Sequence, residues 1–184
     1  RTLRWVLAHE PIEIFIRAAN RFARSISEKT EGKIEIEILS CEEYAKKYQG
    51  LDSVNTQYRY ELMKQLEEGQ LEMTQLYTTT LGSQYHNDLL ALDMPFMFSD
   101  HDHVARVLDG EIGDNLRDGF ATKTNAQPLC FTYSGGFRVL PSSKKISNLS
   151  ELAGEKVRTG SEVSAETFKV LGCEVVKDLL IEEI

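Results

Sequence analysis

The chain opens with a change of hydrophobic period. Every second residue is apolar over residues 2–8, which predicts a strand. From Pro11 the apolar residues recur every three or four positions until Gly32 stops the pattern, which predicts a long helix with one apolar face. Isoleucines then alternate with charged residues over 34–38, and this alternation predicts a half-exposed strand.

The same order of elements repeats after an acidic, tyrosine-rich connector at 40–55. A helix is predicted from Thr56, a possible N-cap, to Gly69, and a strand over 71–76. Strands that alternate with helices in this way favour an α/β sheet with mostly parallel strands over a barrel or sandwich. The simplest interpretation of the connector's tyrosines is that they pack the connector onto the domain. The alternative is that they form a surface that docks a partner.

A second series of elements is expected after a helix that ends near Arg117. We place a boundary near residues 124–128, which divides the chain into lobe I (residues 1–125) and the start of lobe II (residues 126–184). Residues 179–184 look like the first turns of a further helix, so lobe II is expected to lack its later elements. The elements expected in lobe II are strands over 127–134 and up to Leu140 around a Gly135-Gly136 turn, a helical turn over 147–153, a strand ending at Arg158, a helix over 161–171 and a strand over 173–176.

Composition narrows the classes of partner. With 41% apolar residues the 184-residue chain can fill a real core, and its net charge of −8 disfavours nucleic acid and anionic membranes. An anionic ligand would need a recessed, locally positive site. No apolar run approaches the roughly 20 residues that cross a bilayer. The chain begins at Arg1 without a signal-peptide pattern, as expected if an export signal has been removed.

Candidate ligand groups follow the predicted strands, because ligands of open α/β sheets bind beyond the carboxyl ends of the strands. Arg158 ends one strand, and Ser161 follows it at the start of a helix, where backbone N–H groups have no internal partner. Arg138, Tyr77 and His9 also follow strands or turns. Two arginines, hydroxyls and an aromatic ring suit a small carboxylate. From position alone, however, a solvated strand-end arginine is the simpler interpretation of Arg158.

Catalytic and metal-binding alternatives are weaker. His101 and His103 flank Asp102 at a predicted helix start, where Ser99 or Asp100 is a good N-cap, so a capped and solvated helix start is favoured over a metal site. The chain has no G-x-S-x-G elbow, and no spacing proposes a nucleophile beside His9 or His86. Gly135-Gly136 lacks a phosphate-loop pattern and is predicted to form a turn. The odd and widely spaced cysteines, Cys41, Cys130 and Cys173, give no disulfide framework.

Several short motifs follow one another along most of the chain. They are Phe22-Ala23, EKTEGKIEI at 28–36, LEEGQLEM at 66–73, MPFMF at 94–98, DGEIG at 109–113, GFR at 136–138 and NLSELAGEKVR at 148–158. In their order and approximate spacing they resemble one family, the DctP-type substrate-binding proteins of tripartite ATP-independent periplasmic (TRAP) transporters. The resemblance implies a two-lobed, type II periplasmic-binding-protein-like α/β fold.

The resemblance also implies a function and roles for residues. Such proteins close around an organic acid in the periplasm and deliver it to a membrane permease, without catalysis or a cofactor. The family's carboxylate-pairing arginine corresponds to Arg158, and Arg138 is a second carboxylate contact. Ser161 corresponds to a polar contact, Tyr77 lines the pocket and His9 faces the cleft mouth.

Two departures limit the resemblance. The segment at 41–56 is longer and more charged than the loop usual there, and family members continue well past residue 184. Two other functions stay open at this point. One is a sensor or interaction domain of the same fold, and the other is an enzyme that uses His9 or the His101/His103 pair. The sequence does not identify the acid.

Overall fold

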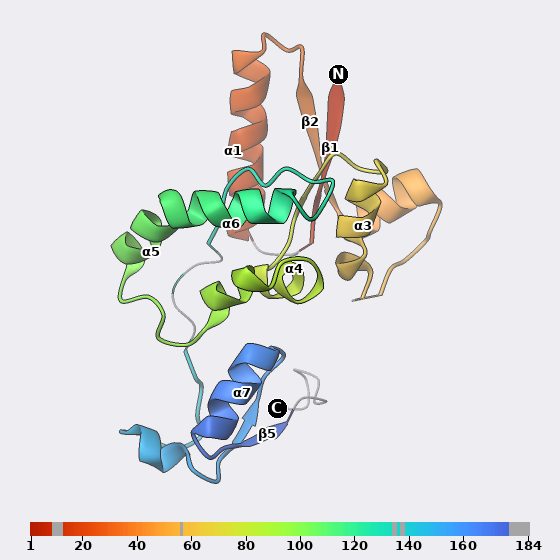
Figure 1. Cartoon of the computed structure of the whole chain (residues 1–184). Coiled ribbons are helices and arrows are strands. Elements are labelled where there is room, and N and C mark those ends of the chain that lie inside the picture. Colours follow the sequence, from red (N-terminus) through yellow and green to blue (C-terminus); the bar gives the residue numbers. More distant parts are fainter. Residues whose placement is uncertain (9–12, 56, 134–135, 137–138, 177–184) are drawn as a thin grey trace.

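The computed structural model describes residues 1–8, 13–55, 57–133, 136 and 139–176 (Figure 1). Two units of parallel strands and helices follow one another along the chain, each with its own small sheet. The predicted α/β class with parallel strands is therefore confirmed. His9, Arg138 and the predicted helix start at 179–184 lie outside the described residues.

The first unit is built on a three-stranded sheet of β1 (Thr2–Leu7), β2 (Glu35–Ser40) and β3 (Met73–Gln75). Its order is β2-β1-β3 and both pairings are parallel, so β1 is central. Val6 lies opposite both Leu39 and Thr74 and is completely buried. The strands predicted from alternation at the start of the chain are thus confirmed.

Helix α1 (Glu13–Lys29) covers this sheet. It buries Phe15 and Ala19 and leaves most of its other residues accessible, as its apolar stripe predicts. Phe22 packs edge-on against Trp5 of β1, with ring centroids 5.6 Å apart. The crossover between two parallel strands by one long helix is the unit that the sequence predicts.

The segment that follows β2 is helical, where the sequence pattern predicts a connector. Helix α2 (Cys41–Tyr44) is opened by a capping box, in which the Ser40 hydroxyl accepts from the backbone of Glu43 and the Glu43 side chain accepts from the backbone of Ser40. A π-helical turn, η1 (Ala45–Gln49), continues it and ends at Gly50, whose φ of 70° suits glycine. The Ser-x-x-Glu spacing was the available signal for this helix.

The connector's tyrosines divide between core and surface. Tyr44 and Tyr58 are buried in the main core, and the Tyr44 hydroxyl donates to the carbonyl of Gln70 at 2.7 Å. Tyr48 and Tyr60 are more than 40% exposed. The predicted packing of the connector onto its domain is therefore confirmed for the first pair. The helix predicted from residue 56 is a short 3-10 turn, η2 (Tyr58–Tyr60), followed by α3 (Leu62–Glu67).

Four helices complete the first unit. Leu89 and Phe120 from two of them pack with Met63 of α3 in a second core. The single helix predicted to end near Arg117 is two helices, because Gly110 adopts an extended conformation and a Cβ there would meet the carbonyl oxygen of Arg106 at 2.6 Å. The helices are α4 (Thr78–Gln84), the 3-10 helix η3 (Asn87–Asp93), α5 (His101–Leu108) and α6 (Glu111–Ala121).

The second unit contains a 3-10 turn, η4 (Leu149–Leu152), and a parallel pair of strands, β4 (Lys156–Arg158) and β5 (Glu174–Val176). Helix α7 (Glu162–Val170) connects the strands. Leu152, Val157 and Cys173 form the core. The helical turn, the strand ending at Arg158, the helix and the last strand are all confirmed.

The strand predicted over residues 127–134 is wrong for the part that the structure describes, and the second strand, up to Leu140, lies partly outside the described residues. The described residues of this segment, 127–133, 136, 139 and 140, belong to no strand. Leu129 is 62% and Val139 83% exposed. Their apolar residues alternate, but a strand also needs a neighbouring strand to accept its backbone hydrogen bonds, and no described strand lies beside them.

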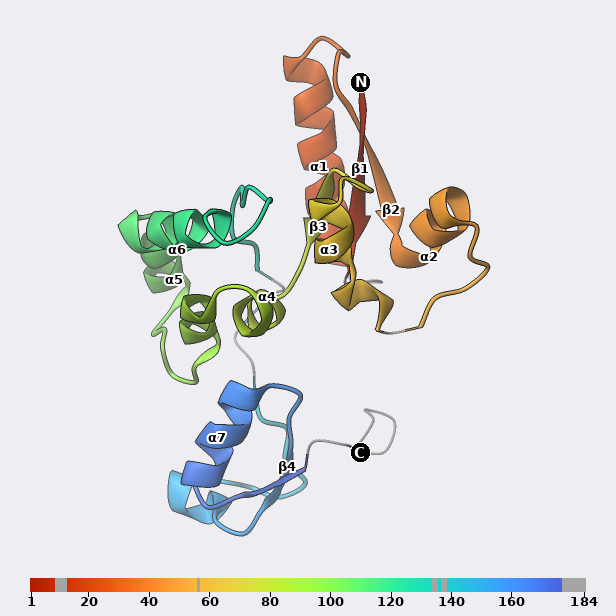
Figure 2. The ribbon, with the colours of Figure 1, turned by 45° about the vertical axis from the view of Figure 1, so that its right-hand side comes forward.

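The second unit lies below the first in both views, and α7 is placed under α4 (Figure 2). Contacts between α7 and η3 join the units. In Figure 1, β1 runs down from the N-terminus, so its carboxyl end lies on the side of the first unit that faces α7. The boundary near residue 125 stays a prediction.

Candidate ligand-binding site

The end of β3 carries the first polar groups of the candidate site. The Thr74 hydroxyl donates to the carbonyl of Val6 at 3.0 Å and ties β3 to the central strand. The Gln75 side-chain amide donates to the Thr132 hydroxyl at 2.6 Å. Because Thr132 belongs to the segment that leads to the second unit, this hydrogen bond links that segment to the edge where β1 and β3 end.

Tyr77 lies where β3 gives way to helix α4. Its backbone is extended, with φ −70° and ψ 142°, and it occupies the N-cap position of α4. The side chain is half-buried. In the next residue the Thr78 hydroxyl donates to Asp93 Oδ2 at 2.8 Å, which joins the start of α4 to the end of η3. Since η3 contacts α7, Tyr77 is on the part of the first unit that is nearest the second.

Arg158 ends β4 and is exposed, whereas Val157 before it is buried. The alternation of a strand explains this difference, because successive side chains point to opposite faces. A Cβ added to Gly160 would lie 3.9 Å from Arg158 Nη1, so the guanidinium passes close to the backbone of Gly160. The charged end of Arg158 therefore lies beside the turn that enters α7.

Ser161 is the N-cap of α7. Its hydroxyl oxygen accepts from the backbone N–H of Ser164 at 3.4 Å, and its own N–H donates to the Thr159 hydroxyl at 3.3 Å. Because the Ser161 oxygen is an acceptor in the cap, its hydroxyl hydrogen remains suited to donate to a further group. A guanidinium, a hydroxyl donor and the N-terminal end of a helix together favour an anion.

The described structure supports a capped helix start, rather than a metal site, at His101 and His103. The Asp100 carboxylate accepts from the backbone N–H of His103 at 2.7 Å and caps α5, and this hydrogen bond is the main cause that lowers the pKa of Asp100. His103 Nδ1 faces the backbone N–H of Ser99 at 3.3 Å. Among the described residues no three metal-ligating side chains are grouped together. The predicted capped helix start is confirmed.

His86, another candidate base, is buried and has a polar neighbour. It is 4% exposed, and Lys123 Nζ lies 2.8 Å from its Nδ1. The cysteines are all free thiols, of which only Cys130 is exposed.

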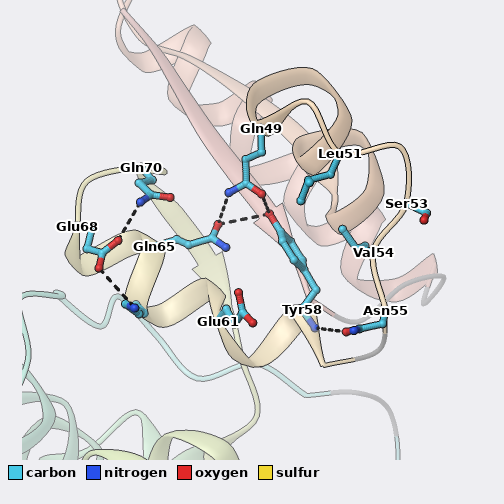
Figure 3. A pocket seen from close by; sticks show the side chains of 11 residues that line it. Gln49, Leu51, Ser53, Val54, Asn55, Tyr58, Glu61, Gln65, Glu68 and Gln70 are labelled. Atoms are coloured by element: carbon cyan, nitrogen blue, oxygen red, sulfur yellow. Dashed lines mark hydrogen bonds and ion pairs between the residues drawn. The ribbon is translucent and has the colours of Figure 1, made fainter.

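Two cavities within the described part of the chain lie away from the ends of β3 and β4. One, of about 470 Å3, is formed by the 49–55 segment and α3 (Figure 3). The other, of about 510 Å3, lies between α1 and the end of β2. Neither is lined by a residue predicted for the acid site. Sequence reasoning missed the first cavity because its walls depend on how the 41–56 segment packs, and only the capping box at Ser40 indicated that this segment is ordered.

Residues 8–177 match the family model DctP, a bacterial extracellular solute-binding protein, family 7. A solute-binding protein of the TRAP type is thus the class that the fold and the match define. The chain belongs to the DctP family of TRAP periplasmic solute-binding proteins, which is not a family of enzymes.

Curated relatives match parts of the chain. A protein of Haemophilus influenzae described as uncharacterized is 38% identical over 96 residues, which are 51% of this chain and 29% of that protein. The C4-dicarboxylate-binding protein DctB of Bacillus subtilis is 27% identical over 156 residues, 84% of this chain and 41% of that protein. The chain therefore spans less than half the length of these two relatives.

Solved structures show the same fold. A TRAP periplasmic solute-binding protein from Sulfurospirillum deleyianum with bound succinate has a TM-score of 0.69 and 28% identity over 95% of this chain and 53% of that one. Another from Pseudomonas putida F1, with bound D-glucuronate, has a TM-score of 0.72 and 22% identity over 96% of this chain and 54% of that one. Within the described residues, every helix is too short or too polar to cross a bilayer.

Proposed function

We propose that this protein captures a small organic acid between two lobes in the periplasm and delivers it to the permease of a TRAP transporter. The observation that carries the proposal is the position of Arg158, at the carboxyl end of a parallel strand and beside the capped start of α7. The relative bound to succinate, at 28% identity, supports a carboxylate ligand. No cofactor is needed for this task.

Each member of the proposed site has a distinct task. The Arg158 guanidinium pairs with both oxygens of the ligand carboxylate, which fixes its orientation as well as its charge. The Ser161 hydroxyl donates to the same group, and Tyr77 lines the opposite wall from the first unit. Arg138 and His9, which lie outside the described residues, are proposed as a second carboxylate contact and a residue at the cleft mouth.

Lobe closure is the proposed means of capture. Residues 1–125 would form lobe I and residues 126–184 the start of lobe II, with a hydrophobic core in each. A ligand held by Arg158 and Ser161 on one side and Tyr77 on the other makes contacts that exist only when the lobes are close together. Such contacts shift the equilibrium toward the closed form.

The overall charge makes the local arrangement important. A net charge of −8 repels an acid at long range, so binding depends on positive and hydrogen-bonding groups that act over a few ångströms. Arg158 and the α7 N-terminus supply such groups together. The same charge balance favours an acid site between lobes, where solvent ions screen less, over an open surface patch.

Calorimetry of Arg158 variants against a panel of organic acids tests the proposal. Arg158→Ala should lower the affinity for the tightest-binding acid by more than about tenfold, because loss of one partner of a buried charge pair costs about 2–5 kcal/mol. Arg158→Lys should weaken it as well, since an ammonium cannot form the two parallel hydrogen bonds.

Lys156→Ala is the matched control. Lys156 is exposed two residues earlier in the same strand and pairs with Glu174 at 3.6 Å. Its loss removes the same formal charge and should leave affinity unchanged. Unchanged affinity in both Arg158 variants would remove Arg158 from the site.

A further inference from the structure

A polar groove in the first unit has features that the acid site does not use. Its walls come from the end of the π-helical turn η1, from the 3-10 turn η2 and from α3 (Figure 3). Turns of the π type are rare and occur frequently at functional sites. The groove measures about 470 Å3, within the range typical of small-molecule sites.

A chain of hydrogen bonds fixes the floor of the groove. The Tyr58 hydroxyl donates to Gln49 Oε1 at 2.6 Å, and Gln49 Nε2 donates to Gln65 Oε1 at 3.2 Å. Burial is the main cause that raises the pKa of Tyr58, so its phenol stays protonated and remains a donor. Figure 3 shows the hydrogen bonds that link these three side chains.

Gln65 is left with unused donors. The residue is only 7% exposed, and its carbonyl oxygen is occupied by Gln49. Its amide nitrogen Nε2 has no hydrogen-bond acceptor among the residues that the structure describes, although this nitrogen carries two N–H groups. Among the described residues the only fully buried side-chain nitrogen or oxygen without a partner is Trp5 Nε1, so Gln65 Nε2 is accessible from outside and can donate to a ligand in the groove.

An acceptor lies beside these donors. Glu61 also lines the groove, and its carboxylate has no hydrogen-bonding or ionic partner within the described chain. Glu68 differs, because it already accepts from Gln70 at 2.8 Å and pairs with Lys64 at 3.9 Å. The ring of Tyr58 and the side chains of Leu51 and Val54 add apolar surface.

We propose that this groove binds a neutral polyhydroxylated molecule of the sugar or polyol class. A hydroxyl group can both accept from Gln65 Nε2 and donate to Glu61, and the C–H face of such a molecule can rest on Tyr58. Glu61 and Glu68 would repel an organic acid. An ammonium is itself a hydrogen-bond donor and would face the N–H donors of Gln65. A neutral molecule with hydroxyl groups therefore fits the groove better than an organic acid or an amine.

Two-dimensional NMR of the side-chain amide groups tests this site on the purified protein. The probes are D-glucose, sucrose and myo-inositol, with succinate as the acidic control. The Gln65 amide signals, assigned by their loss in Gln65→Met, should shift with at least one neutral probe. Glu61 is exposed, and Glu61→Gln should lower the affinity for that probe about tenfold, as expected when a hydrogen bond to a charged group is lost. Asp52→Asn, outside the groove lining, should leave it unchanged.

The outcomes separate the proposal from its alternatives. A shift of the Gln65 signals by a neutral probe that Glu61→Gln weakens supports the site. The absence of any shift with the three neutral probes overturns it, as does equal affinity in wild type and Glu61→Gln. A shift of the same signals by succinate alone would also contradict it, because it would place an acid in the groove. None of these results depends on Arg158, so the acid site stands or fails separately.

Discussion

At the scale of single residues, two strand arginines have different surroundings. Arg4 in β1 holds Glu72 with both ends of its guanidinium, at 2.9 Å each, and its backbone N–H donates to the same carboxylate at 2.8 Å. It also lies over the ring of Tyr48, 5.3 Å from the centroid. Arg4 therefore anchors β1 to the β3 side of the sheet. Arg158 is instead an exposed residue at the end of its strand, and the proposed function gives it a ligand rather than a structural role.

The Arg4–Glu72 pair should make stability depend on pH. The side-chain hydrogen bond from Arg4 is the main cause that lowers the pKa of Glu72 in the folded protein. The ionised Glu72 carboxylate therefore stabilises the folded protein at pH values above its pKa in the unfolded chain, which is near 4.5. This stabilisation is lost as the pH falls through the lower pKa of the folded protein. Glu72→Gln should therefore cost about 1 kcal/mol at pH 7 and much less at pH 3, in urea unfolding.

Asp52→Asn is the control for this experiment, because Asp52 is exposed in a loop. It should change the free energy of unfolding little at either pH. An equal cost of Glu72→Gln at both pH values would contradict the assignment of this stabilisation to the ionised carboxylate.

At the scale of elements, the predictions succeed where one periodicity is strong. The regions of β1, α1 and β2 carry clear alternation or helical spacing, and the structure follows them. Helix α4 starts with three threonines, which have low helix propensity, and its sequence gives little local signal. The strand expected over 127–134 fails in its described part for the opposite reason. Its local pattern is right, but strand pairing depends on neighbours far along the chain.

The junction of α5 and α6 gives a test at this scale. Gly113 lies in α6, and a Cβ there would meet the carbonyl oxygen of Leu108 at 2.0 Å. Gly113→Ala should destabilise the protein by more than about 1 kcal/mol, although alanine is favoured in an ordinary helix by about that amount. Asn115→Ala in the same helix is exposed and should be neutral or slightly stabilising. Thermal unfolding measures both, and a stabilised Gly113→Ala would refute the close approach.

At the scale of the whole molecule, β1–β3 and β4–β5 form two separate sheets of parallel strands. The positions of Arg158, Ser161 and Tyr77 after their strands could be predicted because strand ends in α/β folds are set by local pattern and chain order, and their shared role in one site stays a proposal. The groove around Gln65 could not be predicted, since its walls come from segments whose packing no local pattern fixes. How the strand ends approach one another also depends on tertiary contacts, such as that of α7 with η3.

The most direct test of the account is a crystal structure of the protein with the tightest-binding acid from the calorimetric panel. The account predicts a carboxylate whose two oxygens lie about 2.7–2.9 Å from the guanidinium nitrogens of Arg158, with the Ser161 hydroxyl beside it. A structure in which Arg158 points into solvent, while the acid is bound by other residues, would contradict it.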